Sequence, residues 1–206
     1  MINKIFIRSV FPILLFVIAL LFLSFIPNEK DAAFEPHPLY VLVAVDEEYR
    51  NTHEDWQIRA KEVVEQADDL FNNTFNIDFQ VTAVGKWESD GLNSKEILQD
   101  LKSNWDNPEY DFIVGITLDE NFTEGGIAPI YKEKPKKSAY SVVYDQGDRT
   151  YQSLQHELSH NFGLSHHPED SEIKCIMNYS FLYKISEWDP DHLDQLKKNV
   201  KWYIDS

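Results

Sequence analysis

Eleven residues in the last third of the chain have the types and the spacing of a metal site. Residues 156–166 read HELSHNFGLSH, so His156 and His160 are four apart and His166 follows six residues later. Two histidines four apart on a helix project from one face, and both imidazoles can reach the same ion. Gly163 can adopt a positive φ, which would end the helix and let His166 return as a third ligand. The pattern therefore predicts one metal ion held by three histidines.

The carboxylate next to the first histidine indicates catalysis. Three protein ligands with one open position are the arrangement of catalytic zinc, whereas structural zinc usually has four protein ligands. Glu157 would lie beside the ion, where it can accept a proton from a water molecule rather than bind the metal. A zinc site without turnover is the alternative, but it would have no use for this carboxylate. We therefore predict one catalytic Zn²⁺ ion that activates a water molecule for hydrolysis, with Glu157 as the general base.

The same stretch resembles the signature of a known enzyme family. HELSHNFGLSH is similar to the HExxHxxGxxH motif of the metzincins, which are zinc endopeptidases. Met177 stands in CIMNY, eleven residues after the third histidine, and this segment resembles the metzincin Met-turn. The resemblance implies that His156, His160 and His166 bind zinc and that the Met177 side chain forms an apolar floor beneath them.

Residues around the Met-turn resemble different metzincin groups. The sequence Cys-Ile-Met is similar to the reprolysins, although there the cysteine is normally disulfide-bonded and Cys175 is the only cysteine. Tyr179 is similar to a tyrosine of astacins and serralysins that approaches the metal and stabilises the transition state; a core tyrosine is the alternative. His167 matches none of the familiar groups. We therefore expect a metzincin and favour a reprolysin-like bacterial branch.

Two other functions agree with part of the pattern. An aminopeptidase of the archaemetzincin kind would carry an additional cysteine-based zinc site after the motif, which one cysteine cannot build. A membrane-tethered zinc-binding or adhesion domain without catalysis is the second alternative. Replacing Glu157 by glutamine would distinguish it from a peptidase, because zinc should still bind and activity should vanish.

Residues outside the motif have less specific interpretations. By family analogy, an extended peptide substrate would pair with an edge strand expected at 127–131, beginning at Ile127 and Ala128. His167 is expected to be solvated; a displaced metal ligand or a substrate contact is the alternative. The remaining histidines outside the motif, His37, His53 and His192, are expected at the surface. Calcium at Asp145, Asp148 or 189–194 is possible but unsupported, because the spacing matches no known loop.

Apolar patterning predicts the elements that position this site. Short apolar or alternating runs predict strands at residues 39–45, 77–84, 112–118, 127–131 and 139–144. Helical spacing predicts helices at 52–75, from Ser94, at 150–162 and at 190–204. The interleaved order indicates an α/β (α+β) fold with a mixed, twisted sheet of about five strands. The metzincin resemblance adds an active-site helix, a Met-turn and a C-terminal helix to this fold.

Composition and charge limit the partners. The chain has 206 residues, of which 43% are hydrophobic, and a formal net charge of −16. Residues 1–30 carry a net charge of +2, so residues 31–206 carry −18. Such an acidic region repels phosphate backbones, so nucleic acid is not expected as a partner. A protein or peptide substrate and a monomeric state are expected.

The first thirty residues differ from the rest. Lys4 and Arg8 precede the mostly apolar run 10–26, which is typical of a signal peptide or an N-terminal membrane anchor at residues 1–30. Residues 31–38 are expected to be a linker, and 39–206 to be the zinc metallopeptidase domain. The positive charges before the apolar run predict a secreted or membrane-anchored protein with its catalytic domain on the extracellular side.

Overall fold

The computed structural model describes residues 35–205, so the signal peptide or anchor expected at residues 1–30 lies outside the described part. All helices and strands below belong to one compact unit, Pro36–Ser206. Among the described residues, no helix combines the length and the apolar character needed to cross a membrane.

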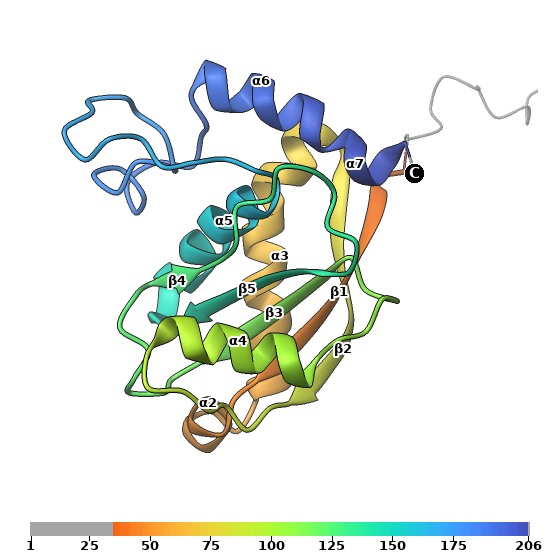
Figure 1. The fold of residues 1–206 in the computed structure, drawn as a ribbon, viewed down its shortest axis with the longest axis vertical. Helices are drawn as coiled ribbons and strands as arrows, with labels where there is room; N and C mark the ends of the chain where they lie inside the picture. Colours follow the sequence, from red (N-terminus) through yellow and green to blue (C-terminus); the bar gives the residue numbers. More distant parts are fainter. Residues whose placement is uncertain (1–34, 206) are drawn as a thin grey trace, which may run out of the picture. The chain divides into compact units, whose positions relative to one another are not determined.

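A mixed sheet forms the centre of this unit (Figure 1). Its strands are β1 (His37–Val45), β2 (Ile77–Lys86), β3 (Phe112–Thr117), β4 (Gly126–Ile127) and β5 (Ala139–Tyr144). They lie in the order β2-β1-β3-β5-β4, with parallel pairing except between β4 and β5, which are antiparallel. The sheet confirms the expected mixed α/β fold with five strands. Strand β4 is one of its edges.

Helices cover both faces of the sheet. The helices α3 (Trp56–Phe75) and α5 (Thr150–Asn161) lie on one face, and α4 (Ser94–Asn104) lies on the other (Figure 1). The apolar run of β1 is continuous because both of its faces are buried. Leu39 and Val41 belong to the core on the α3 side, and Leu42 belongs to the core on the α4 side. Parallel strands that are buried on both faces have this composition.

An aromatic cluster connects α3, the sheet and the end of α5. The ring of Phe71 lies 5.3 Å from Phe79, 5.6 Å from Phe162 and 4.9 Å from Trp188, measured between centroids. Phe71, Phe79 and Phe162 are fully buried. Because Phe162 directly follows α5, this packing fixes the end of that helix against the core.

The helix expected at 52–75 begins only at Trp56, as α3, and an additional short helix, α2 (Glu47–Thr52), precedes it. Asp46 caps α2 by accepting a hydrogen bond from the backbone N–H of Tyr49, and the chain is extended at His53 before α3 begins. Likewise, Asn93 rather than Ser94 caps α4, because its side chain accepts from two backbone N–H groups of the first turn.

Three further boundaries differ from the sequence prediction. Strand β4 ends at Ile127, so Ala128 lies just beyond it; the following Pro129 has no N–H to donate to a neighbouring strand. The C-terminal helix is divided at Val200 into α6 (Pro190–Asn199) and α7 (Lys201–Ile204). The last two residues of the expected linker, 37–38, pair with β2. A short 3₁₀ turn, η3 (Gly147–Arg149), precedes α5.

Candidate active site

Helix α5 is tied to the sheet at its C-terminal end. The side chain of Asn161 accepts a hydrogen bond from the Ser141 hydroxyl at 2.8 Å and donates one to the carbonyl oxygen of Tyr140 at 3.1 Å. Asn161 and Ser141 are buried, so both bonds are shielded from water. They fix the helix end against β5. The sequence prediction did not single out Asn161.

The turn after α5 takes the shape that the glycine allows. Gly163 has a φ of +89°, and its N–H donates to the carbonyl oxygen of His160 at 2.8 Å. Two side chains of α6 hold this turn: Gln195 donates to the carbonyl oxygen of Gly163, and Asn199 to that of Phe162. Nothing in the sequence pattern marked Gln195 or Asn199. These two hydrogen bonds fix the backbone of residues 162–163, from which the chain continues to His166.

Three imidazoles meet beside α5. The Nε2 atom of His166 lies 2.9 Å from that of His156 and 2.8 Å from that of His160. Three nitrogens bound to one zinc ion in a tetrahedral arrangement would be about 3.4 Å apart, so small ring movements would admit the ion. The three residues therefore fit one zinc ion as ligands.

The opposite ring nitrogens have partners that orient two of these histidines. The Nδ1–H group of His156 donates to the carbonyl oxygen of Ile176 at 2.8 Å. That of His160 donates to the carbonyl oxygen of Leu164 at 2.7 Å. Each bond directs an unprotonated Nε2 toward the common centre, as metal-binding histidines require.

The electrostatics keep these ligands neutral. Burial, reinforced by neighbouring histidines, lowers the pKa of His156 to about 3 and that of His160 to about 4. Burial also lowers the pKa of His166. At neutral pH all three rings are therefore unprotonated and able to donate a lone pair to a cation.

Glu157 lies between the histidines and the edge strand. Its side chain is 5% exposed, and burial raises its pKa to about 8. A methyl group added to Gly126 on β4 would lie 2.6 Å from the Glu157 Cγ atom, so only glycine permits this close approach. A dication at the three histidines would favour the charged carboxylate.

The segment expected to form the Met-turn contains a tight turn. The N–H of Asn178 donates to the carbonyl oxygen of Cys175 at 3.0 Å, and the Asn178 side chain donates to the carbonyl oxygens of Ser171 and Ile173. Met177 is completely buried in this turn. Its neighbour Ile176 supplies the carbonyl oxygen that orients His156, which links the turn to the histidine site.

Tyr179 lies over the histidines and is not a core residue. It is 59% exposed, and its ring centroid is 4.4 Å from that of His166. Its hydroxyl is 3.4 Å from the Nδ1 atom of His166. The hydroxyl is therefore beside the histidine site and accessible to a substrate.

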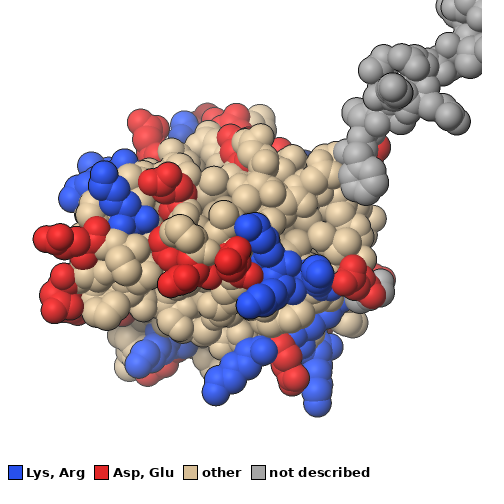
Figure 2. Space-filling view, turned by 90° about the horizontal axis from the view of Figure 1, so that it is seen from above, with Lys and Arg blue, Asp and Glu red and all other residues tan. Residues whose placement is uncertain are grey.

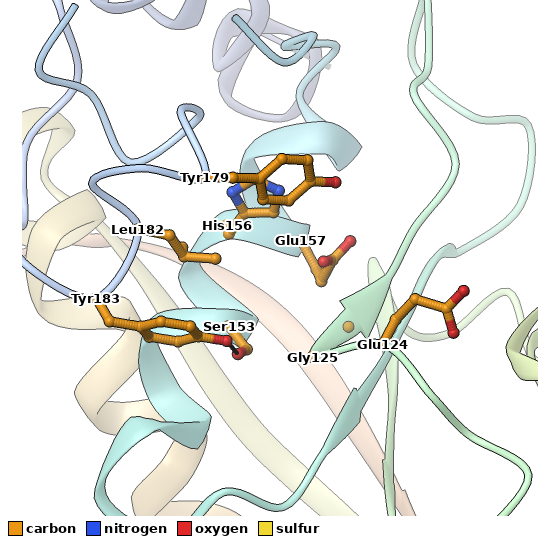
Figure 3. A pocket seen from close by; sticks show the side chains of 9 residues that line it. Glu124, Gly125, Ser153, His156, Glu157, Tyr179, Leu182 and Tyr183 are labelled. Atoms are coloured by element: carbon orange, nitrogen blue, oxygen red, sulfur yellow. Dashed lines mark hydrogen bonds between the residues drawn. The ribbon is translucent and has the colours of Figure 1, made fainter. Parts of the chain in front are cut away.

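A cavity of about 250 Å³ opens beside the histidines (Figure 3). Glu157 and Tyr179 line its upper part in the view of Figure 3, and Leu182 lines one wall. Its other end carries the hydroxyl groups of Ser153 and Tyr183, which are 2.9 Å apart. The cavity therefore extends from the Glu157 carboxylate to an end that carries two hydroxyl groups.

Several other side chains do not lie where the sequence suggested. His53 is partly buried and 3.1 Å from Asp145, which also accepts hydrogen bonds from the backbone of Gly147 and the hydroxyl of Thr150. These bonds engage the Asp145 carboxylate in shaping the start of α5. The structure therefore adds no support for calcium at this carboxylate.

The prediction that His167 is solvated and His192 lies at the surface was wrong. Both side chains are largely buried, and both contact the carboxylate of Asp189, at 2.9 Å and 2.8 Å. His37 is partly buried at the start of β1.

On the face drawn in Figure 2, acidic and basic side chains are interspersed around an uncharged area.

Comparison with known proteins agrees with this geometry. A reprolysin model of metallopeptidase family M12 matches residues 38–188. An archaemetzincin of Sulfolobus acidocaldarius is 27% identical over 107 residues, which cover 46% of this chain and 59% of that protein. The chain thus spans less than two thirds of the length of this relative.

The family match covers the sheet, the three histidines, Glu157 and the Met-turn. It agrees with the metzincin resemblance, including its reprolysin-like character, and metallopeptidases of this family use zinc. The match extends over more than half of the sequence, and the chain therefore belongs to metallopeptidase family M12.

Proposed function

We propose that this chain is a zinc-dependent endopeptidase in which His156, His160 and His166 hold the metal and Glu157 is the general base. The observation that carries the proposal is the convergence of three neutral Nε2 atoms beside a buried carboxylate and an open cavity. The family match supports a metallopeptidase. The glutamate mechanism and the endopeptidase specificity go beyond that match.

A bound zinc ion supplies a Lewis acid that polarises the substrate carbonyl and makes a neighbouring water more acidic. The Glu157 carboxylate accepts the proton of the attacking water and later donates it to the leaving amine. The backbone of Gly126 packs against the Glu157 side chain and restricts its position. A base held in this way needs little rearrangement during the reaction.

Two further features would bind the substrate. The hydroxyl of Tyr179 is accessible and can donate a hydrogen bond to the oxygen that becomes negative during attack. An extended peptide can pair with the backbone of β4 at Ile127 and continue past Ala128. One substrate side chain would then enter the cavity beside Ser153 and Tyr183.

The first test is cleavage of casein by the purified full chain, with zinc, with a chelator, and as the Glu157→Gln variant. We expect chelator-sensitive cleavage that the variant lowers by about 100- to 10,000-fold, because general bases contribute on that order. The variant should bind as much zinc as the wild type. A wild type that binds zinc but cuts neither casein nor a diverse peptide library would favour the zinc-binding or adhesion domain without catalysis.

A second assay separates endopeptidase from aminopeptidase activity. Peptides with an acetylated N-terminus and a quenched fluorophore pair can be cut only internally. We expect cleavage of these blocked peptides at rates similar to those of the unblocked peptides. Cleavage restricted to free N-termini would contradict the endopeptidase assignment while leaving the zinc mechanism intact.

The proposal includes a location, which rests on the N-terminal sequence alone. A signal peptide or anchor at residues 1–30 would place the catalytic domain outside the cell, as a monomer that acts on extracellular proteins or peptides. Protease accessibility of the domain in intact cells that produce the full chain tests this location. Protection of the domain until the cells are lysed would contradict it.

A further inference from the structure

Four side chains outside the active site point their ligand atoms at one place. They are His167, Cys175, Asp189 and His192, and their potential ligand atoms all lie within 4.8 Å of one another. They come from three parts of the chain: the residue after His166, the tight turn, and the start of α6. No regular helix or strand lies between α5 and α6, so the backbone hydrogen bonds of a helix or sheet do not hold this segment in place (Figure 1). The cluster brings its two ends together.

The distances suit a small cation. The Oδ2 atom of Asp189 is 2.9 Å from the Nε2 atom of His167 and 2.8 Å from the Nδ1 atom of His192. The Sγ atom of Cys175 is 3.3 Å from the same His192 nitrogen. Ligand atoms around tetrahedral zinc are about 3.3–3.7 Å apart. The short contacts of Asp189 would lengthen when an ion binds, and the widest separations in the cluster, which stay within 4.8 Å, would shorten.

The surrounding hydrogen bonds leave the converging atoms available. Asp189 uses its other oxygen, Oδ1, to cap α6 by accepting from the backbone N–H groups of Asp191 and His192. This leaves Oδ2 to face the two imidazoles. The Cys175 sulfur accepts from the backbone N–H of Met177 at 3.5 Å, a contact that would also stabilise a metal-bound thiolate.

The chemistry and burial of the donors distinguish between roles. A cysteine beside a histidine and an aspartate could also suggest a nucleophile, but Cys175 is fully buried and no substrate can reach its sulfur. Four protein donors of sulfur, nitrogen and oxygen type match zinc with a closed coordination shell. Such a site has no open position for catalysis and would be structural.

We propose that His167, Cys175, Asp189 and His192 bind a second, structural zinc ion that fastens the turn around Met177 to the start of α6. Counting cysteines alone excluded a cysteine-based cluster, but histidine and carboxylate donors can complete a site that contains one thiolate. Binding of this ion can be measured without any peptide cleavage, so the proposal is tested separately from the proposed function.

The primary test measures metal content and cobalt spectra of the full chain. Wild-type protein should contain two zinc ions per chain by mass spectrometry of the metal. After exchange into cobalt, it should show a thiolate-to-cobalt charge-transfer band in the near ultraviolet. Because Cys175 is the only cysteine, any such band reports this site and not the three histidines. One ion per chain without the band would overturn the proposal.

Two variants separate the sites. Cys175→Ser should lower the content from two ions to one and abolish the charge-transfer band. His160→Ala, the matched control, should also reduce the content to about one ion but keep the band. Two zinc ions per chain in Cys175→Ser, or loss of the band in His160→Ala, would refute the assignment. If Cys175→Ser does not fold, the wild-type ion count and band still decide.

Discussion

Replacing Gly126 by alanine should move the carboxylate of Glu157, the proposed general base, without unfolding the protein. The added methyl carbon would lie 2.6 Å from the Cγ atom and 2.7 Å from the Oε1 atom of Glu157, whereas ordinary contacts begin near 3.4 Å. The carboxylate must therefore withdraw by about 0.8 Å. A side-chain end moves at little cost in stability, but a displacement near 1 Å can cost about 100-fold in rate. That loss corresponds to about 2.7 kcal/mol of transition-state stabilisation.

The assay is kcat and KM on a quenched peptide, together with the zinc content and the melting temperature of each variant. Gly125→Ala is the matched control, because its methyl group would contact the Tyr183 hydroxyl at 2.7 Å and not Glu157. We expect Gly126→Ala to lower kcat and Gly125→Ala mainly to raise KM for bulky side chains. A Gly126→Ala enzyme with kcat within threefold of wild type would refute the positioning of Glu157 by this glycine.

Three further changes test the framework of the site. Gly163→Ala should lower the free energy of unfolding by about 3 kcal/mol in a urea titration, because Gly163 has a φ of +89° and the new methyl group would meet the carbonyl oxygen of Tyr131. Gly147→Ala is the control and should cost only about 1 kcal/mol, because Gly147 also has a positive φ but its methyl group would lie in open space. Burial raises the pKa of Asp68 to about 7, so its contribution to the free energy of unfolding is complete below pH 4 and is lost as the pH rises through 7. The Asp68→Asn variant should therefore be as stable as the wild type near pH 4 and more stable at pH 8, by up to about 4 kcal/mol. Phe71→Ala should lower the free energy of unfolding by about 3–5 kcal/mol, and a loss below 1 kcal/mol would contradict the central place of that ring.

The sequence predicted the elements whose residues follow a strong period. The strands β1, β3 and β5 are apolar runs, as expected for strands buried on both faces of the sheet. The four-residue spacing of His156 and His160 predicted the helix α5. The predicted starts of helices were wrong where a polar capping residue sets the start. Asp46 starts α2, which the apolar pattern did not predict, and Asn93 caps α4 one residue before the predicted cap, Ser94.

The convergence of His156, His160 and His166 was predictable because they are close in sequence and the first two have a spacing that helix geometry explains. The residues that hold this helix in place were not. Asn161, Gln195 and Asn199 are ordinary polar residues by type, and only their partners in the fold reveal a function. A single sequence contains no period that joins a helix end to its hydrogen-bond partners more than twenty residues away.

The same limit explains why the second cluster was missed, and it connects both sites. His167 directly follows the ligand His166, and Cys175 begins the turn that contains Met177. Asp189 caps α6, whose later turn holds the chain at Gly163. A cation at the second cluster would therefore brace the segment that carries His166 and Tyr179 from both ends. The loss of that ion should loosen the active site by releasing a segment that no helix or strand fixes, even though none of the four donors touches the substrate.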